Sequence, residues 1–268
     1  MSITCDFHLH SNFSSDSDTP MEDMIQAAIK RGLKTICFTE HMDLDYPEEC
    51  GSFQADIPAY KQEICRLQSV FQDIIDIRFG IELGMQPHLG PRCAALAHEY
   101  PFDFIVASQH LVGGQDPYYR DYWNGKEEQI VYREYFSELL TNLQSMKEFD
   151  TVAHLDYIVR YGPNQNQFYS YQSYADHIDP ILKYIIDQGK CLEVNTAGLK
   201  YGLKHPNPEE SVLKRYRELG GERITIGSDA HQPEHIAYDF AKAEAVLKEL
   251  GFQSYCIFHG RKPNIIPL

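Results

Sequence analysis

Short apolar runs alternate with longer amphipathic stretches from one end of the chain to the other. The apolar runs have the length of strands and are bounded by turn residues. They occupy Ser2–Phe7, Thr35–Phe38, Ile75–Leu83, Phe104–Ala107, Thr151–Leu155, Cys191–Asn195, Arg223–Ile226 and Ser254–Phe258. We expect each of these segments to form a strand.

The stretches between the strands have helical spacing. They occupy Pro20–Arg31, Pro58–Gln72, Arg92–Glu99, Glu127–Glu148, Asp176–Gln188, Pro208–Leu219 and His235–Leu250. The first helix is expected to begin at Pro20, with Asp18 or Thr19 as its cap, and to run to Arg31, with Gly32 closing it. Two long aromatic loops cover residues 113–125 and 157–174. The alternation predicts a parallel α/β sheet, and the number of strands favours closure into one barrel domain that takes in residues 1–268.

Composition and charge narrow the possible partners. The chain is 43% hydrophobic and 24% charged, which is typical of a globular protein and excludes wholesale disorder. With 39 acidic and 24 basic residues, the net charge is −15. A surface this acidic repels nucleic-acid backbones and anionic lipid, so we expect neither as a partner. An anionic substrate would need local basic residues or bound cations.

The seven cysteines do not form a recognisable framework, because their number is odd and the sequence has no Cys-x-x-Cys pair. Cys37, Cys191 and Cys256 lie in apolar runs and are expected to behave as small hydrophobic residues. The first residues have no signal-peptide pattern, and no stretch approaches the length of a membrane span. The sequence therefore favours a soluble protein in a reducing, cytoplasmic compartment.

Histidine and carboxylate residues gather where the predicted strands end. They are His8, His10 and Asp16, then Glu40 and His41, then Glu82, His110, His154 with Asp156, and finally Asp229 with His231. In a parallel barrel these ends share one face, where the active sites of such folds lie. Five further histidines have no partner at ligand spacing and are expected to be solvated or structural; they are His88, His98, His177, His235 and His259. His205 is set apart from them because it lies in the loop after the sixth predicted strand.

Residues two apart on a strand project to the same side, which places His8 with His10 and Asp229 with His231. Converging imidazole and carboxylate groups suit divalent zinc, iron or manganese. A single His-x-His pair is weak evidence, but the joint pattern at six strand ends predicts a metal site. The candidate ligands are too many for one ion, so we expect two to three ions that share a bridging carboxylate.

These residues resemble the motifs of the PHP family, the polymerase and histidinol phosphatase domain. The similar segments are HLH at 8–10, TEH at 39–41, GIE at 80–82, SQH at 108–110, AHLD at 153–156 and GSDAH at 227–231. Length, the region of Arg160 and the VNTAGL segment look most like the stand-alone histidinol-phosphate phosphatases of bacteria. The resemblance implies a distorted (β/α)7 barrel with three metal ions at the C-terminal ends of its strands.

Carried over from the family, the ligands fall into three sets. The first set is His8, His10, Glu82 and Asp229; the second is Glu82, His110 and His154; the third is Asp16, His41 and His231. Glu82 would bridge two ions. Asp16 is a choice between neighbours, because many family members place a histidine in this loop and Asp18 is the alternative.

Such a cluster would present a metal-bridging hydroxide as the nucleophile and neutralise the phosphoryl oxygens. Arg160 is the leading phosphate clamp, with Lys200 and His205 as further candidates, although each could be a solvated loop residue. Glu193 and Asn195 share the inward side of a strand and would contact substrate or form a structural network. Asp229 or His231 could relay a proton to the leaving group.

Tyrosines crowd the two long loops, and their role is open between substrate stacking and packing of the loop on the barrel rim. They are Tyr118, Tyr119, Tyr122 and Tyr161, with Trp123 beside them. Stacking on an imidazole ring would favour a substrate that carries one. Packing on the rim is the expectation for most of them.

The sequence therefore predicts a metal-dependent phosphomonoesterase that hydrolyses L-histidinol phosphate. A second hypothesis is a phosphoesterase of the same family that acts on nucleotides or another small phosphate monoester. A third is a non-catalytic module of the kind fused to polymerases, which would have lost ligands. A fourth is a metal-free barrel, which would leave the histidines unexplained. Oligomeric state cannot be inferred from the sequence.

Overall fold

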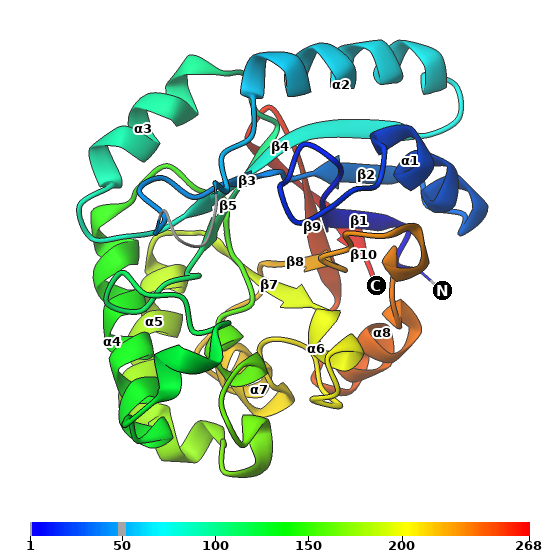
Figure 1. The fold of residues 1–268 in the computed structure, drawn as a ribbon. Helices are drawn as coiled ribbons and strands as arrows, with labels where there is room; N and C mark the ends of the chain where they lie inside the picture. Colours follow the sequence, from blue (N-terminus) through cyan, green and yellow to red (C-terminus); the bar gives the residue numbers. More distant parts are fainter. Residues whose placement is uncertain (1, 48–51) are drawn as a thin grey trace.

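Within residues 2–47 and 52–268, which the computed structural model describes, seven parallel strands form the wall of a nearly closed barrel (Figure 1). In order around the wall they are β1 (Cys5–Leu9), β2 (Thr35–Phe38), β4 (Asp76–Gly84), β5 (Phe104–Ser108), β6 (Thr151–Val152), β7 (Cys191–Asn195) and β8 (Ile224–Gly227). A short strand, β3 (His41–Met42), extends the wall by pairing with β4. The predicted α/β barrel is confirmed.

The barrel closes between its first and last strands at one end. The amide of Asp229 donates to the carbonyl of His8 at 2.9 Å, and the amide of His10 donates to that of Ala230 at 2.9 Å. A single parallel bridge, Leu9 to Ala230, marks this seam. The seam thus lies at the C-terminal ends of β1 and β8, next to the predicted ligands.

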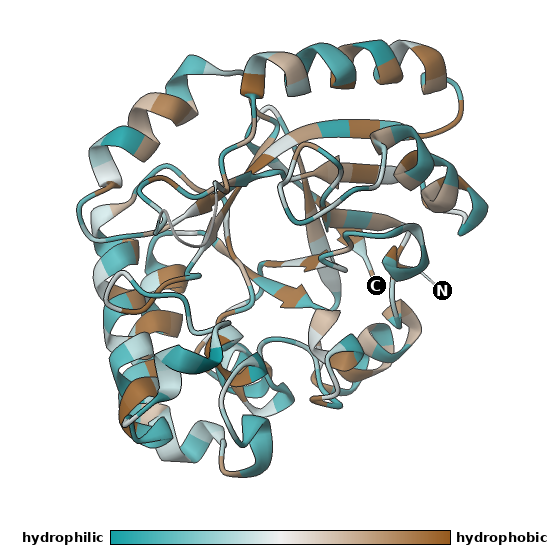
Figure 2. Cartoon of the chain, in the orientation of Figure 1, coloured by the Kyte–Doolittle hydropathy of each residue, from teal (hydrophilic) through white to brown (hydrophobic). Residues whose placement is uncertain are grey.

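Helices pack around the wall and cover its outer face (Figure 1). They are α1 (Met21–Lys30), α2 (Ile57–Phe71), α3 (Gly90–Glu99), α4 (Glu128–Ser145), α5 (Ala175–Asp187), α6 (Ala197–Lys200), α7 (Glu210–Glu218) and α8 (Phe240–Glu249). The longer helices carry both hydrophobic and hydrophilic residues (Figure 2). By contrast, every residue is buried in the strands β1, β2, β5, β7 and β8. In α5 the buried side is formed by Ile178, Ile181, Leu182 and Ile185, the spacing of an amphipathic helix.

Several predicted boundaries differ from the observed ones by a few residues, and for three of them the structure shows a local reason. Helix α1 begins at Met21 without a side-chain cap, because the Thr19 hydroxyl bonds to the His231 carbonyl instead, at 3.2 Å. Strand β6 ends at Val152 rather than Leu155, since the chain turns sharply at His154, where φ is 25°. Helix α8 begins at Phe240 rather than His235, after a separate turn at Pro233–His235.

The C-terminal segment forms a hairpin rather than the single predicted strand. Strands β9 (Ser254–His259) and β10 (Lys262–Pro267) pair antiparallel to each other, apart from the barrel sheet. The hairpin packs against the N-terminal end of the barrel, with the rings of Phe258 and Phe104 5.0 Å apart. Strand β10 was missed because its two prolines and exposed residues lack an alternating pattern, although proline is tolerated on an edge strand.

The cysteines outside the undescribed segment 48–51 are free thiols, as expected; Cys50 lies within that segment. Cys37, Cys191 and Cys256 are all buried. Among the described residues, no helix has both the length and the apolar character needed to cross a membrane.

Candidate active site

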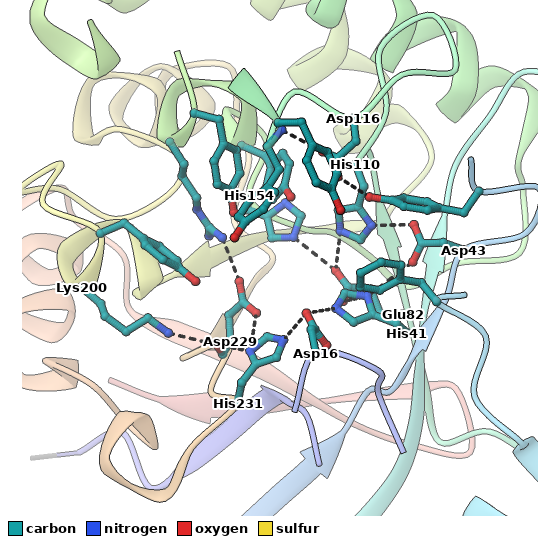
Figure 3. A pocket seen from close by; sticks show the side chains of 18 of the residues that line it. Asp16, His41, Asp43, Glu82, His110, Asp116, His154, Lys200, Asp229 and His231 are labelled. Atoms are coloured by element: carbon teal, nitrogen blue, oxygen red, sulfur yellow. Dashed lines mark hydrogen bonds and ion pairs between the residues drawn. The ribbon is translucent and has the colours of Figure 1, made fainter. Parts of the chain in front are cut away.

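A cavity of about 550 Å³ opens at the C-terminal ends of the barrel strands. Its walls combine histidine and carboxylate side chains, two basic residues and a set of aromatic rings (Figure 3). The polar lining residues are Asp16, His41, Asp43, Glu82, His110, Asp116, His154, Arg160, Lys200, Asp229, His231, Gln232 and His235. Most of the strand-end residues of the sequence therefore line one cavity, whereas His8, His10, Glu40 and Asp156 are fully buried and are not part of its surface.

Glu82, near the C-terminal end of β4, lies at the centre of this cluster. Its Oε2 is 3.2 Å from Nε2 of His8, 3.3 Å from Nε2 of His10 and 3.2 Å from Nδ1 of His41. Its Oε1 is 3.2 Å from Nε2 of His154 and 3.3 Å from Nε2 of His110. One carboxylate therefore touches two groups of imidazoles, one group on each oxygen.

Asp229 and Asp16 extend the cluster on the side of β1 and β8. Oδ1 of Asp229 is 3.6 Å from Nε2 of His10, and Oδ2 of Asp16 is 3.1 Å from Nε2 of His231 and 3.5 Å from Nε2 of His41. Asp18, the alternative, is exposed and does not line the cavity. Of the two aspartates, Asp16 is the one that lies beside the histidines.

Several of these atoms are buried without a hydrogen-bond partner among the described residues. They include Nε2 of His8, of His10 and of His231, Nδ1 of His41 and Oε2 of Glu82. An unpartnered polar atom in a protein interior is costly. Two ligands that each lie about 2.1 Å from one divalent ion are roughly 3.0–3.4 Å apart. The separations around Glu82 have this size, so the side chains present fit bound metal ions.

Outer carboxylates orient two of the imidazoles toward Glu82. Nδ1 of His8 contacts Oε1 of Glu193 at 2.6 Å, and Nδ1 of His110 contacts Oδ1 of Asp43 at 2.7 Å. A histidine held at one ring nitrogen by a carboxylate presents the other nitrogen to a metal. Glu193 thus lies behind His8 rather than on the cavity surface, and its predicted contact with substrate has no geometric support.

Gly227, the first residue of the GSDAH segment, makes this packing possible. A Cβ at this position would lie 2.3 Å from Cβ of His8 and 2.6 Å from Oε1 of Glu193. Both contacts are closer than such atoms approach in folded proteins, so a larger residue would displace the histidine or its carboxylate partner.

Arg160 reaches the cavity from the turn Tyr157–Arg160 and is buried. Its Nη1 donates to Oδ2 of Asp229 at 3.0 Å, and its Nη2 donates to Oδ1 of Asn195 at 2.9 Å. Nε donates to Oδ1 of Asn207 at 2.8 Å. Asn195 therefore holds the guanidinium in place and does not itself line the cavity.

Of the two remaining predicted basic contacts, Lys200 and His205, only Lys200 lines the cavity. Lys200 lines the cavity, with Nζ 3.4 Å from the carbonyl of Asp229. Nδ1 of His205 contacts the carbonyl of Pro206 at 2.6 Å, and this residue is not part of the cavity wall.

The cavity perturbs the ionisation of its groups. Burial would raise the pKa of Glu82, but His8, His41 and His110 outweigh it and hold that pKa well below the usual range. Burial lowers the pKa of the Lys200 ammonium, against the attraction of Asp229. Burial also raises the pKa of Glu40 to about 7, against hydrogen bonds from Ser11 and Ser14. The cavity therefore has an ionised carboxylate at its centre and a lysine that gives up its proton more easily than usual.

Asp43 is the main residue that the sequence analysis missed. It is buried between His41 and His110, and Gly84 makes room for it, since a Cβ there would lie 2.1 Å from its Oδ1. The two-residue spacing from His41 was the available signal. His235, expected to be structural or solvated, lies at the cavity wall.

Aromatic side chains form the rest of the wall. They are Tyr46, Phe53, Tyr118, Tyr119, Tyr157, Tyr161 and Tyr201. Tyr122 and Trp123 are not among these lining residues and pack against each other and the core. The tyrosines of the two long loops therefore fall into two groups. Tyr118, Tyr119, Tyr157 and Tyr161 line the cavity, whereas Tyr122 packs with Trp123 against the core.

Three comparisons with known proteins agree. The PHP domain model matches residues 6–197. The chain is 33% identical to the histidinol-phosphatase of Lactococcus lactis over 96% of this chain and 95% of the relative, and 35% identical to the probable histidinol-phosphatase of Clostridium acetobutylicum over 89% and 90%.

A solved structure matches as well. The histidinol phosphate phosphatase from Lactococcus lactis, complexed with zinc, L-histidinol and phosphate, superimposes with a TM-score of 0.89 at 31% identity, covering 97% of this chain and 98% of that one. A putative histidinol phosphatase from Listeria monocytogenes has the same fold, with a TM-score of 0.78 at 17% identity.

Proposed function

The chain belongs to the PHP domain family, and from that premise we propose that it hydrolyses L-histidinol phosphate to L-histidinol and phosphate with the help of two to three divalent metal ions. The observation that carries the proposal is the position of Glu82 between two groups of imidazoles. The nitrogens that face its Oε2, from His8, His10 and His41, have no hydrogen-bond partner among the described residues. The cavity around it also holds Arg160 and Lys200. Similarity to histidinol-phosphatases over nearly the whole chain supports the choice of substrate.

The ligands would divide as the family resemblance implies. His8, His10, Glu82 and Asp229 would hold the first ion; Glu82, His110 and His154 the second; and Asp16, His41 and His231 the third. Zinc is the metal in the Lactococcus lactis structure, and iron or manganese would suit the same donors. Bound ions would supply positive charge and an acidified water molecule for attack on phosphorus.

The protein's own basic groups would bind the phosphoryl oxygens. Arg160 is held by Asp229, Asn195 and Asn207, which use one hydrogen on each of its nitrogens. Each terminal nitrogen of a guanidinium carries two hydrogens, so one remains on each for a phosphate. Lys200 also lies beside Asp229, with Nζ 3.4 Å from its carbonyl oxygen (Figure 3). Two fixed positive groups in an otherwise acidic protein would select an anionic ester.

The rest of the cavity would accept the histidinol part of the substrate. Asp116 lies among the aromatic rings and accepts a hydrogen bond from Tyr46 at 2.5 Å. A carboxylate in such a wall would pair with the substrate ammonium, and tyrosine rings would flank its imidazole. Proton transfer to the leaving alkoxide would fall to Asp229 or His231, which both line the cavity.

A substrate panel tests the proposal. Metal-reconstituted protein is assayed with histidinol phosphate, nucleoside monophosphates and simple sugar phosphates, and metal content is measured in the same samples. We expect kcat/KM to be highest for histidinol phosphate by at least about a hundredfold. A preference for nucleotides would favour the alternative phosphoesterase, and protein with at most one ion per chain would contradict the metal assignment.

The partners and compartment follow from the proposed reaction. The substrate is a small phosphate monoester, and binding to nucleic acid or membranes is not expected of a chain with a net charge of −15. The cytoplasmic location remains a prediction.

A further inference from the structure

Glu40 is a buried carboxylate just behind the ligand cluster, and it is not a candidate ligand. It follows β2 and precedes His41. Its oxygens accept from the Ser11 amide at 3.1 Å, the Ser11 hydroxyl at 2.5 Å and the Ser14 hydroxyl at 2.6 Å. Every one of these donors belongs to the loop that follows β1. Glu40 thus holds the loop that carries Asp16.

Ser14 connects Glu40 to two histidines. Its Oγ lies 3.1 Å from Nδ1 of His10 and 3.0 Å from the amide nitrogen of His41. A hydroxyl has one hydrogen, and here it is donated to Glu40. The oxygen can then only accept from its remaining neighbours, which means that Nδ1 of His10 carries a hydrogen.

The consequence falls on the second ring nitrogen of His10. A neutral imidazole protonated on Nδ1 has its lone pair on Nε2. That atom is buried without a hydrogen-bond partner among the described residues and lies 3.3 Å from Oε2 of Glu82. The lone pair therefore points into the ligand cluster, which is the form that binds a metal.

We propose that Glu40 and Ser14 are positioning residues that fix the tautomer of His10 and the backbone of His41 for metal binding. We call the hydrogen bonds from Glu40 through Ser14 to His10 and His41 the relay. Its importance for catalysis rests on the proposed function, but the tautomer of His10 does not. On His10 and His41, Glu40 acts through Ser14, and neither Glu40 nor Ser14 lines the cavity.

The chain offers matched variants. Ser14→Ala removes the acceptor for His10 and His41, whereas Ser11→Ala removes a hydroxyl bond to the same Glu40 and leaves the relay intact. Glu40→Gln tests direction, because its amide can donate to Ser14 and so let the Ser14 hydroxyl donate to Nδ1 of His10. Ser14→Thr retains the hydroxyl and should restore binding.

The experiment has two readouts at pH 8. The first is zinc affinity by competition with a chelator, for which we expect Ser14→Ala and Glu40→Gln to lose roughly 10–100-fold, as changes behind metal ligands do. Ser11→Ala and Ser14→Thr should stay within about threefold of wild type on the same scale. Equal losses of zinc affinity in Ser11→Ala and Ser14→Ala would show that these hydrogen bonds only stabilise the loop, and this result would overturn the proposal.

The second readout is the tautomer of His10 in metal-free wild-type protein, measured by long-range proton–nitrogen correlation NMR and assigned by its disappearance in His10→Gln. We expect hydrogen on Nδ1 in wild type and on Nε2 in Glu40→Gln. Hydrogen on Nε2 in wild type would overturn the relay even if every variant failed to fold. A wild-type protein that binds no zinc would contradict the proposed function while the NMR result still decided the relay.

Discussion

The two ends of the barrel both hold carboxylates with little exposure, but only at the C-terminal end do carboxylate oxygens, those of Asp43 and Glu82, lack a hydrogen-bond partner among the described residues. At the N-terminal end, Asp103 accepts from the amides of Phe79 and Gly260 at 3.1 and 2.8 Å, and Asp150 accepts from the Ile105 amide at 2.8 Å and from Arg261. At the C-terminal end, Oε2 of Glu82 and the imidazole nitrogens around it have no hydrogen-bond partner among the described residues. We call the N-terminal end of the barrel the paired end and the C-terminal end the unpaired end. The hydrogen bonds of the paired end stabilise the fold, whereas the unpartnered atoms of the unpaired end are available to bind metal ions.

We expect the largest effect on metal content and activity from Glu82→Ala, at the unpaired end. The substitution removes the group that both sets of imidazoles face, so we expect the loss of more than one ion. We expect kcat/KM on histidinol phosphate to fall by at least about a thousandfold, or about 4 kcal/mol in the barrier. Metal analysis and steady-state kinetics on the same preparation check it. Full metal content in the variant would show that Glu82 is not the bridge.

Arg160 should give the next largest effect. Loss of a charge-assisted contact to phosphate in Arg160→Ala or Arg160→Lys should cost roughly 2–4 kcal/mol in kcat/KM, about thirty- to a thousandfold. Metal content should be unchanged, because a guanidinium is not a ligand. Near-wild-type kinetics in both variants would transfer the role to Lys200. Activity that falls together with metal content would show instead that Arg160 supports Asp229.

The lowered pKa of Lys200 leads to a prediction about pH. The ammonium is charged below its pKa, and that pKa lies below the ordinary value for lysine, so phosphate binding should weaken as the pH rises through it. We expect kcat/KM to fall about tenfold on the alkaline side. Lys200→Arg should move this limb to higher pH, since arginine stays charged. An unchanged alkaline limb in Lys200→Arg would exclude this lysine as its source.

The smallest effect on activity is expected at the paired end. Arg261→Ala removes one donor from Asp150, whose contact with the Ile105 amide remains, and should lower the free energy of unfolding by about 1–3 kcal/mol. The kcat/KM should stay within about twofold, because the hairpin lies at the far end of the strands from the cavity. Denaturant unfolding and the phosphatase assay check both halves. A large loss of activity in a variant that remains stable would contradict the assignment of the paired end to stability alone.

The sequence was most informative where chemistry follows strand periodicity. His8 with His10 and Asp229 with His231 could be grouped because strand ends of a parallel barrel share one face, and the structure brings them together. The fold class could be predicted for the same reason, since β2 and β7 match their apolar runs residue for residue.

What the sequence could not predict depends on contacts between distant strands. Alternation places Glu193 and Asn195 on the inner side of β7, but only the structure shows that His8 and Arg160 stand between them and the cavity. Asp43 follows a strand of only two residues, which is too short to show an alternating pattern, so its spacing from His41 was the only signal. The position of His154 depends on a positive φ that a short apolar run does not reveal.

The seam between β1 and β8 has a consequence for how the protein is made. The first set of proposed ligands combines His8 and His10 with Asp229, from nearly opposite ends of the chain. A contact between such distant residues forms late, because the intervening chain must be ordered first. During synthesis the ribosome would have released most of the barrel before this set could exist. Metal acquisition would then be a final maturation step, and nascent chains that end before residue 229 should hold the first ion far more weakly than the complete protein.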